Sequence, residues 1–281
     1  MISVSPSDLI LIRELNHHYF GNHLSDQKEQ LILNRMKKLF RNQSRFATIH
    51  DMLKAIKRGE FVQEFINAFT TNKTSFFREL IHFEDLKTRV FPEVFDSSSQ
   101  IRIYSSASST GEEAYSAGIT FLNYNSGQTK PLQAKIYATD VDTLVLEKAK
   151  AGIYPFNQKE SPFPHWVDPR LYFERRATDG ELNVLIRAKE SLRSLVNFQN
   201  HNLLDSALPF TNTHFDVIFC RNVLIYFNES NQEKILKKLF GMLKIGGTLY
   251  TGHAETPTCL YNYIEKIGPS IYKKNSNMMG A

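Results

Sequence analysis

The chain has 281 residues and a net charge of +5, and its 42% hydrophobic and 22% charged residues are typical of a globular protein with a sizeable core. No segment approaches the roughly 18 consecutive apolar residues of a membrane-spanning helix, and residues 1–15 lack the features of a signal peptide, so we expect neither membrane insertion nor secretion. Only two cysteines are present, which argues against a disulfide scaffold and favours a cytoplasmic location.

The first 70 residues predict helices and no strands. Ser5-Pro6-Ser7-Asp8 combines an N-cap, a proline at the first helical position and an acidic residue at N3, so a helix should start here and end near Gly21. Apolar stripes at helical spacing lie within 32–40 and within 49–56. We therefore predict an all-α N-terminal domain over residues 1–70.

Basic residues concentrate in the second and third of these helices. The window 28–58 holds nine basic residues and only two acidic ones, so its charge of +7 exceeds that of the whole chain. This surplus implies an acidic partner, whether nucleic acid, anionic lipid or an acidic protein surface, although a merely solvated basic face is the simpler alternative. The histidines at 17, 18 and 23 lack cysteine or carboxylate neighbours at ligand spacing, so we predict no metal site.

From residue 100 onward, strand patterns alternate with helical patterns, which predicts an α/β domain with a largely parallel sheet over residues 71–281. The expected strands are 101–104, 134–139, 195–199, 215–220 and 248–252. The expected helices are 112–124, 143–150 and 232–243, the last ended by Gly246-Gly247. Residues 152–194 break the alternation, and apolar runs around Thr178-Asp179-Gly180 indicate a hairpin, so we predict a small inserted antiparallel subdomain there.

The loop after the first of these strands is the strongest indication of a ligand. Residues 105–111 are all small and let the backbone approach a ligand closely, and Glu112 and Glu113 follow them. A carboxylate pair repels a pyrophosphate but suits a cation, so a small, positively charged cofactor without phosphate, S-adenosylmethionine, fits the loop. A helix start with acidic residues favoured by the helix dipole fits the same residues, and the loop alone does not separate the two.

Polar residues also follow the next strands, at the edge where parallel sheets bind ligands. Asp140 could accept both hydroxyls of a ribose, and Asp142 is placed to cap the following helix. Asn202 could bond an adenine edge while Leu203 packs on its face, although asparagine is common in loops. Together these positions predict a pocket for a nucleoside.

Two further segments supply polar residues beside that edge. Arg221-Asn222 follow the fourth strand, and Tyr226 could direct its hydroxyl toward a reacting centre, although a core aromatic is the simpler interpretation of Tyr226 alone. Upstream, Asn72, Thr74 and Arg78 surround a pair of phenylalanines in the segment that joins the helical region to the sheet. Arg78 could clamp a carboxylate with its guanidinium.

Taken in order, these segments resemble the chemotaxis receptor methyltransferases, the CheR-type family, which form methyl esters on glutamates of membrane-bound methyl-accepting chemotaxis proteins. The resemblance rests on 71–79 (TNKTSFFRE), 107–116 (ASSTGEEAYS), 140–142 (DVD), 215–227 (FDVIFCRNVLIYF) and 252–255 (GHAE). It implies a Rossmann-like S-adenosylmethionine-dependent methyltransferase domain with an inserted antiparallel β-subdomain, preceded by the helical domain. The cofactor would leave as S-adenosylhomocysteine.

The resemblance also implies roles for individual residues. Arg78 and Tyr226 would stand nearest the transferred methyl group, Glu113 would take the cofactor's ammonium group, and Glu112 would be a helix-start acid. The residues implied to line the cofactor site are Asn72, Thr74, Arg78, Glu113, Asp140, Asn202, Leu203, Arg221 and Asn222. The residues implied to dock the cytoplasmic helical methylation region of a receptor are Arg35, Lys37, Lys38 and Arg41.

Family members that bind a receptor's C-terminal pentapeptide carry a glycine-rich loop in the inserted subdomain, whereas residues 175–182 offer only Gly180. We therefore expect direct docking without pentapeptide tethering. A nucleic-acid methyltransferase and a non-catalytic S-adenosylmethionine-binding signalling adaptor are the alternatives. The lack of an Asn/Asp-Pro-Pro-aromatic motif and of aromatic residues among the basic ones argues against nucleic acid, and the presence of every expected site residue argues against the adaptor.

Overall fold

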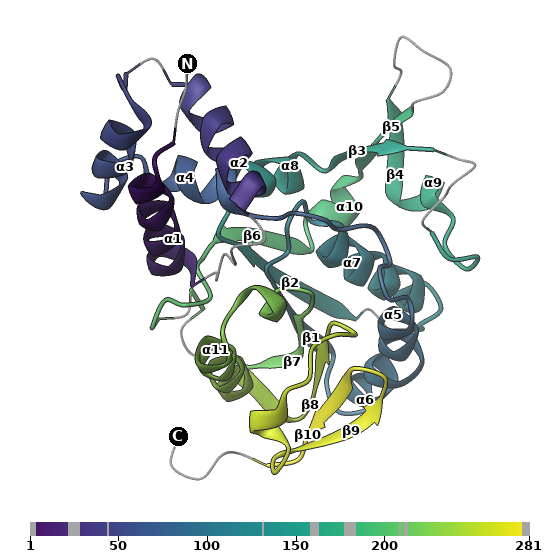
Figure 1. Ribbon diagram of the computed structural model, residues 1–281. Coiled ribbons are helices and arrows are strands. Elements are labelled where there is room, and N and C mark those ends of the chain that lie inside the picture. The colour runs from purple at the N-terminus through teal and green to yellow at the C-terminus, as the bar shows by residue number, and fades with distance from the viewer. Residues whose placement is uncertain are drawn as a thin grey trace.

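The computed structural model describes residues 4–21, 29–43, 45–130, 132–157, 163–176, 184–207, 209–210 and 213–276. A group of N-terminal helices lies beside a large α/β unit, and a small three-stranded sheet projects from that unit (Figure 1). The predicted fold class is confirmed: helices come first, a Rossmann-like sheet follows, and the small antiparallel sheet is inserted between its strands.

Within the described part of residues 4–69, four helices form the N-terminal group: α1 (Pro6–Phe20), α2 (Glu29–Arg41), α3 (Ile49–Lys57) and α4 (Val62–Phe69). The predicted start of α1 is present as a capping box, in which the backbone N–H of Asp8 donates to Ser5 Oγ and the N–H of Ser5 donates to Asp8 Oδ2. Gly21 ends the helix at φ 63°, a left-handed conformation that suits glycine. The helices enclose a core of their own that includes Ile12, Met36 and Phe65.

Among the residues that the structure describes, the main sheet has seven strands in the order β6-β2-β1-β7-β8-β10-β9. Its first five are parallel and match the strands expected from the sequence, whereas β10 and β9 are antiparallel additions at one edge that the sequence patterns did not indicate. In sequence order the strands are β1 (Gln100–Ser106), β2 (Gln133–Asp140), β6 (Val196–Asn200), β7 (Phe215–Cys220), β8 (Leu243–Thr251), β9 (Ile264–Gly268) and β10 (Ile271–Lys274).

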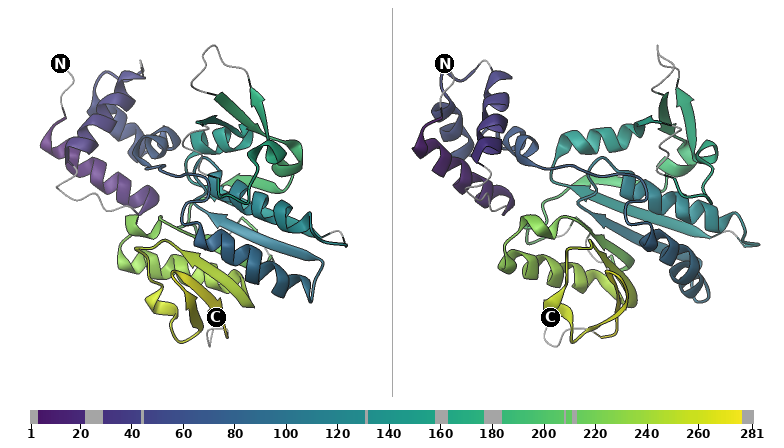
Figure 2. Two further views of the ribbon diagram at one scale, coloured as in Figure 1. Left: turned by 90° about the vertical axis from the view of Figure 1, so that its right-hand side faces the viewer. Right: turned by 45° about the vertical axis from the view of Figure 1, so that its right-hand side comes forward.

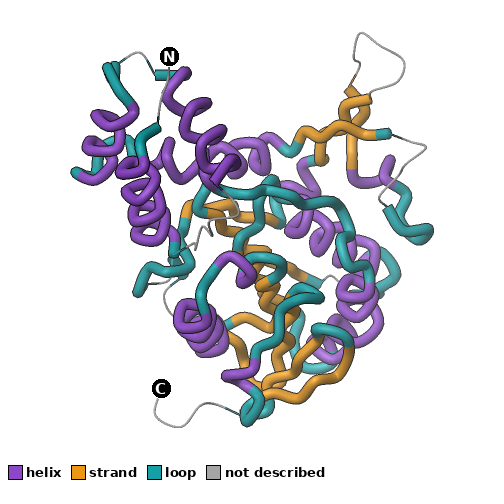
Figure 3. Tube along the Cα trace, viewed as in Figure 1, coloured by secondary structure: helices purple, strands orange, loops and turns teal. Residues whose placement is uncertain are grey.

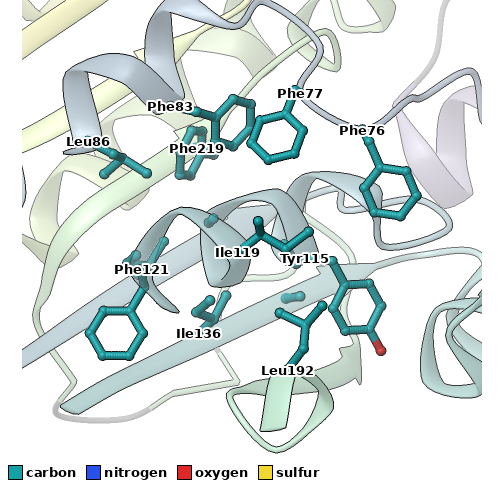
Figure 4. Packing of buried hydrophobic residues seen from close by; sticks show 14 of the residues in the cluster. Phe76, Phe77, Phe83, Leu86, Tyr115, Ile119, Phe121, Ile136, Leu192 and Phe219 are labelled. Atoms are coloured by element: carbon teal, nitrogen blue, oxygen red, sulfur yellow. The ribbon is translucent and has the colours of Figure 1, made fainter. Parts of the chain in front are cut away.

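Helices cover both faces of this sheet (Figure 2). On one face, α7 (Glu112–Asn125) and the segment from α5 (Ile81–Asp85) through a π-helical turn (Leu86–Val90) to α6 (Phe91–Phe95) enclose a core that holds Phe77 and Phe219 (Figure 4). On the other face, α11 (Glu229–Met242) packs over Tyr104 and Ile218. Adjacent residues of β1, such as Ile103 and Tyr104, therefore contribute to opposite cores, as strand alternation requires.

The prediction that Gly246-Gly247 ends the last helix is wrong. Helix α11 ends at Met242, and β8 begins at the next residue. The two glycines lie inside β8, where the pairing with β7 jumps from Phe215–Leu243 to Val217–Thr248. Strand β8 therefore has more residues in this interval than β7, and the irregularity accommodates them. Gly246 adopts φ 78° there, so the glycines belong to a bulged strand and not to a helix end.

The small sheet has the order β3-β5-β4, all antiparallel, and appears among the orange strands of Figure 3. It follows α8 (Thr143–Ala151) and comprises β3 (Ile153–Phe156), β4 (Phe173–Arg176) and β5 (Val184–Ala188), with the short helices α9 (Pro169–Tyr172) and α10 (Glu190–Arg193). The expected hairpin strands are β4 and β5, and β3 was not expected. The predicted turn at 178–180 lies outside the described residues.

Candidate functional site

A cavity opens at the carboxyl ends of β1, β2, β6 and β7, where parallel sheets bind ligands. Helix α1 contributes Phe20 to its wall, and the segment after α4 contributes residues 70–74. The sequence-predicted cofactor and catalytic residues all line this one cavity: Asn72, Thr74, Arg78, Glu113, Asp140, Asn202, Leu203, Arg221, Asn222 and Tyr226. Residues from five separate segments of the chain therefore converge at one place.

The small-residue loop forms one wall of the cavity. Ala107 and Ser109 adopt φ values of 60° and 50°, which directs the backbone across the end of β2. The N–H of Ser108 donates to the Thr139 carbonyl at 2.8 Å, and Ser108 Oγ is buried without a hydrogen-bond partner among the described residues. Gly111 has φ 94°, and a Cβ there would lie 2.9 Å from the Cβ of Ala149, so this position requires glycine.

The two aspartates after β2 have separate structural roles. Asp142 caps α8, since its Oδ1 accepts the N–H groups of Leu144 and Val145. Asp140 is buried, and its carboxylate accepts backbone N–H groups, from Ser109 at 2.8 Å and Asp142 at 2.9 Å, with a further backbone contact from Val141. A carboxylate has about four acceptor positions, so Asp140 keeps acceptor capacity for a ligand hydroxyl. Burial raises the pKa of Asp140 from 3.8 to about 6.

Asp142 also holds the segment that enters the cavity from α4. Its Oδ2 accepts the Thr70 hydroxyl at 2.6 Å and the side-chain amide of Asn72 at 2.7 Å. Asn67 of α4 donates to Thr143 Oγ1, one residue further along the chain. The helical region and the sheet are thus hydrogen-bonded to each other directly beside the cavity.

A buried group of three charged side chains lies at the end of β7. Arg221 Nη1 is 2.9 Å from Glu113 Oε2, Arg221 Nη2 is 3.2 Å from Glu79 Oε2, and Nη2 also donates to the Arg78 carbonyl. With both carboxylates ionised, the group carries one surplus negative charge. Burial raises the pKa of Glu113, whereas Arg221 and neighbouring hydrogen bonds outweigh burial at Glu79 and lower its pKa. Glu113 therefore faces Arg221 as well as the cavity.

A second buried carboxylate shapes the loop that follows β7. Glu255 accepts the N–H groups of Asn222 at 2.7 Å, Leu224 at 2.7 Å and Ile225 at 3.3 Å. These bonds fix the backbone that presents Asn222, at φ 56°, and Tyr226 to the cavity. The sequence placed Glu255 and Glu79 in recognisable motifs but gave no sign of these contacts.

The side chain of Asn202, expected to bond adenine, is already engaged. Its Nδ2 donates to the Tyr19 carbonyl of α1 at 2.6 Å, and its Oδ1 accepts the N–H of Leu204 at 3.0 Å. Lys238 of α11 holds the same turn by donating to the carbonyl of Leu203 at 2.5 Å. Because an amide nitrogen has two hydrogens, Asn202 can keep the α1 contact and still face a ligand.

The four basic residues of α2 do not share one surface. Lys37, Lys38 and Arg41 line a shallow groove together with asparagines 34 and 42. Arg35 instead donates to the Phe69 carbonyl and, at 3.0 Å, to Thr71 Oγ1, in the segment that leads into the cavity. Burial lowers the pKa of Arg35, an effect partly offset by Tyr226. Arg35 thus links α2 to the cavity wall.

The cavity suits S-adenosylmethionine. Its walls hold the buried carboxylates Glu113 and Asp140, which suit a ligand that carries sulfonium and ammonium charges. The unpartnered Ser108 hydroxyl and the remaining acceptor capacity of Asp140 provide polar groups for a ligand. Among the described residues no group of three or more His, Cys, Asp or Glu is placed to hold a metal ion, and no helix is long and apolar enough to cross a membrane.

The fold and the cavity define a Rossmann-like domain with a ligand site at the carboxyl ends of its parallel strands. Residues 72–270 match the family described as "CheR methyltransferase, SAM binding domain", and the chain belongs to this family. It is 38% identical to the chemotaxis protein methyltransferase of Klebsiella aerogenes, covering 96% of this chain and 90% of that one. The corresponding protein of Salmonella typhimurium is 34% identical, over 96% of this chain and 91% of that one. That of Borreliella burgdorferi is 32% identical, over 98% of this chain and 96% of that one.

Proposed function

We propose that this protein transfers the methyl group of S-adenosylmethionine to glutamate side chains of methyl-accepting chemotaxis receptors in the cytoplasm. The observation that carries the proposal is the convergence of the predicted cofactor residues with Arg78 and Tyr226 on one cavity, in a chain whose relatives are named chemotaxis protein methyltransferases. In this proposal residues 1–70 form the receptor-docking domain, and residues 71–281 form the methyltransferase domain, with 152–194 as its insertion.

The cavity would hold the cofactor along its length. Asp140 accepts the ribose hydroxyls, because its carboxylate is oriented by two backbone N–H groups. Leu203 and the Asn202 turn cover the adenine end, and the surplus negative charge of the Glu79–Arg221–Glu113 group attracts the ammonium end. When bound, S-adenosylmethionine supplies an electrophilic methyl group on a positively charged sulfur.

The reaction needs no general base, because a glutamate side chain is already ionised at neutral pH. The protein's task is to align a carboxylate with the methyl group and to exclude water. Arg78 donates one guanidinium N–H to the Lys73 carbonyl at 2.9 Å, and this bond fixes the direction of the Arg78 side chain. The other guanidinium N–H groups can donate to an acidic side chain. Tyr226 lies in the same cavity and offers a hydroxyl donor.

Histidines have no proton-transfer role in this mechanism. His82 is fully buried next to the Glu79–Arg221 pair, and burial together with Arg221 lowers its pKa to about 4, so it is neutral and a poor base at pH 7. His253 is exposed and lies 3.9 Å from Glu79 Oε2. Substituting either histidine by a residue that preserves the fold should leave methyl transfer in place.

The acceptor would approach along α2. The groove of Lys37, Lys38 and Arg41 presents three cations to an acidic receptor helix. Arg35 connects α2 itself to the cavity wall. Tethering through a receptor C-terminal pentapeptide is not part of the proposal, since the segment that would supply the loop offers one glycine.

The test uses tritiated S-adenosylmethionine and membranes that contain chemotaxis receptors. The proposal predicts label in the receptor and release of labelled methanol on mild base treatment, which is diagnostic of a methyl ester. Tyr226→Phe and Arg78→Ala should lower kcat, whereas His253→Ala should not. Label in RNA, or cofactor binding without transfer to any acceptor, would instead support one of the two alternative functions.

A further inference from the structure

Two exposed isoleucines lie close in the chain to residues that line the cavity. Ile225, with 53% of its surface exposed, immediately precedes Tyr226, and Ile81, with 38% exposed, lies three residues after Arg78. Single exposed apolar residues are common on proteins and need no explanation by themselves. Here, however, each isoleucine is within three positions of a residue proposed to stand at the methyl group, Tyr226 or Arg78.

The contacts of the described residues place the two isoleucines on either side of one junction. Asn222 Nδ2 donates to Glu79 Oε1 at 3.2 Å and so joins the loop after β7 to the segment just before α5. Ile225 lies three residues beyond Asn222, and Ile81 lies two residues beyond Glu79. Asn222 itself lines the cavity, so the two backbone segments that carry the isoleucines meet beside it.

The backbone that carries Ile225 is held on both sides. Glu255 accepts the N–H groups of Leu224 and Ile225, and Gln232 Nε2 donates to the carbonyls of Leu224 at 3.0 Å and Phe227 at 2.9 Å. A rigid backbone presents the isoleucine at a fixed place, so a partner that covers it loses little conformational entropy in this loop.

We propose that Ile225 and Ile81 form an apolar rim that packs against the receptor segment bearing the acceptor glutamate and so positions that glutamate in the cavity. Charge complementarity identifies this occupant, since Arg78 and the exposed Lys73 line the cavity. A separate cationic groove lies on α2, the helix whose Arg35 contacts the cavity wall at Thr71. A receptor helix with apolar residues beside an acidic residue would pack its apolar side chains on the isoleucines and bring its carboxylate to the cations.

The rim makes a contact that differs in kind from the docking groove. Its binding energy is apolar and close to the reacting atoms, whereas the groove acts through charge at a distance. Added salt should therefore weaken the contribution of the α2 lysines and leave that of Ile225 nearly unchanged. Neither isoleucine is placed among the residues that hold the cofactor.

The proposal rests on the proposed function and is tested with a soluble cytoplasmic fragment of a chemotaxis receptor as the acceptor. Ile225→Ser should raise KM for the fragment about tenfold, the effect of exposing most of one aliphatic side chain, while Ile225→Leu should stay within about twofold. Ile245→Ser is the matched control, because Ile245 is 62% exposed and lies near the opposite end of the sheet, in the first part of β8.

Binding of S-adenosylhomocysteine, measured by calorimetry, should be the same in all of these variants. The rim is refuted if Ile225→Ser changes KM no more than Ile245→Ser does. It is equally refuted if Ile225→Ser weakens S-adenosylhomocysteine binding as much as it raises KM, because the isoleucine would then only support the fold of the cavity. Failure of the wild-type protein to methylate the fragment would contradict the proposed function itself.

Discussion

Asp140 is the residue whose removal tests the cofactor site most sharply. In Asp140→Asn the buried carboxylate becomes a neutral amide of nearly the same shape. One amide end still accepts a backbone N–H, but the other end presents a donor to the N–H of Ser109 or Asp142. We expect the variant to fold and to bind S-adenosylhomocysteine about tenfold to a hundredfold more weakly at pH 7.5, because it loses hydrogen bonds to a charged acceptor.

The raised pKa of Asp140 sets how much this residue changes the free energy of unfolding between two pH values. The pKa of Asp140 is raised from 3.8 to about 6, so the folded protein takes up the proton before the unfolded chain does as pH falls. The ionised carboxylate therefore costs stability at neutral pH, and this cost is relieved as pH falls through 6. Between pH 7.5 and pH 5, Asp140 should add about 1.4 kcal/mol to the free energy of unfolding, a contribution absent in Asp140→Asn.

Cofactor binding should show the opposite trend. At pH 5 only about one molecule in eleven keeps Asp140 ionised, so the dissociation constant of S-adenosylhomocysteine should rise about tenfold relative to pH 7.5. Calorimetric titration of both proteins at both pH values measures this, and urea denaturation measures stability in parallel. The reasoning is refuted if the wild-type dissociation constant is the same at both pH values, or if Asp140→Asn binds as tightly as the wild type.

Other substitutions test the charged groups and the core. Arg221→Met leaves Glu79 and Glu113 buried without their cation and should lower the free energy of unfolding by about 3–5 kcal/mol in urea denaturation. A wild-type stability would mean that the three side chains are not a coupled group. Glu255→Gln places an amide donor among several N–H groups that need an acceptor. It should lower the free energy of unfolding by about 1–3 kcal/mol and should also lower kcat. Unchanged kinetics would show that the loop after β7 does not depend on this carboxylate. Phe77→Ala, in the core over α7, should cost about 3–5 kcal/mol, and a thermal midpoint equal to that of the wild type would contradict the packing in Figure 4.

Local chemistry explains which parts of the fold could be predicted from the sequence. The start of α1 depends on four adjacent residues, and the parallel strands depend on short apolar runs, so both are visible in the sequence. The edge strands β9 and β10 are different. Their residues alternate weakly. Strand β10 pairs with the open edge of β8 and β9 pairs with β10, so both depend on the assembled sheet.

The same distinction applies to the cavity. The positions that follow strands were predictable, because the carboxyl ends of parallel strands meet at one edge. The contacts among those residues were not, because Arg221 meets Glu113 and Glu79 across more than a hundred positions of sequence. Sequence patterns likewise could not show that Asn202 contacts α1 or that Arg35 turns toward Thr71, since both depend on how the helical region packs on the sheet.

The most direct test of the central claim is to locate the transferred methyl group by mass spectrometry. A receptor fragment incubated with the protein and S-adenosylmethionine should gain the mass of a methylene group on specific glutamate side chains, and mild base should remove it. Arg78→Ala and Tyr226→Phe should slow the gain without preventing S-adenosylhomocysteine binding. A receptor that gains no mass while another acceptor is methylated, or a base-stable methyl group on another side chain, would contradict the account.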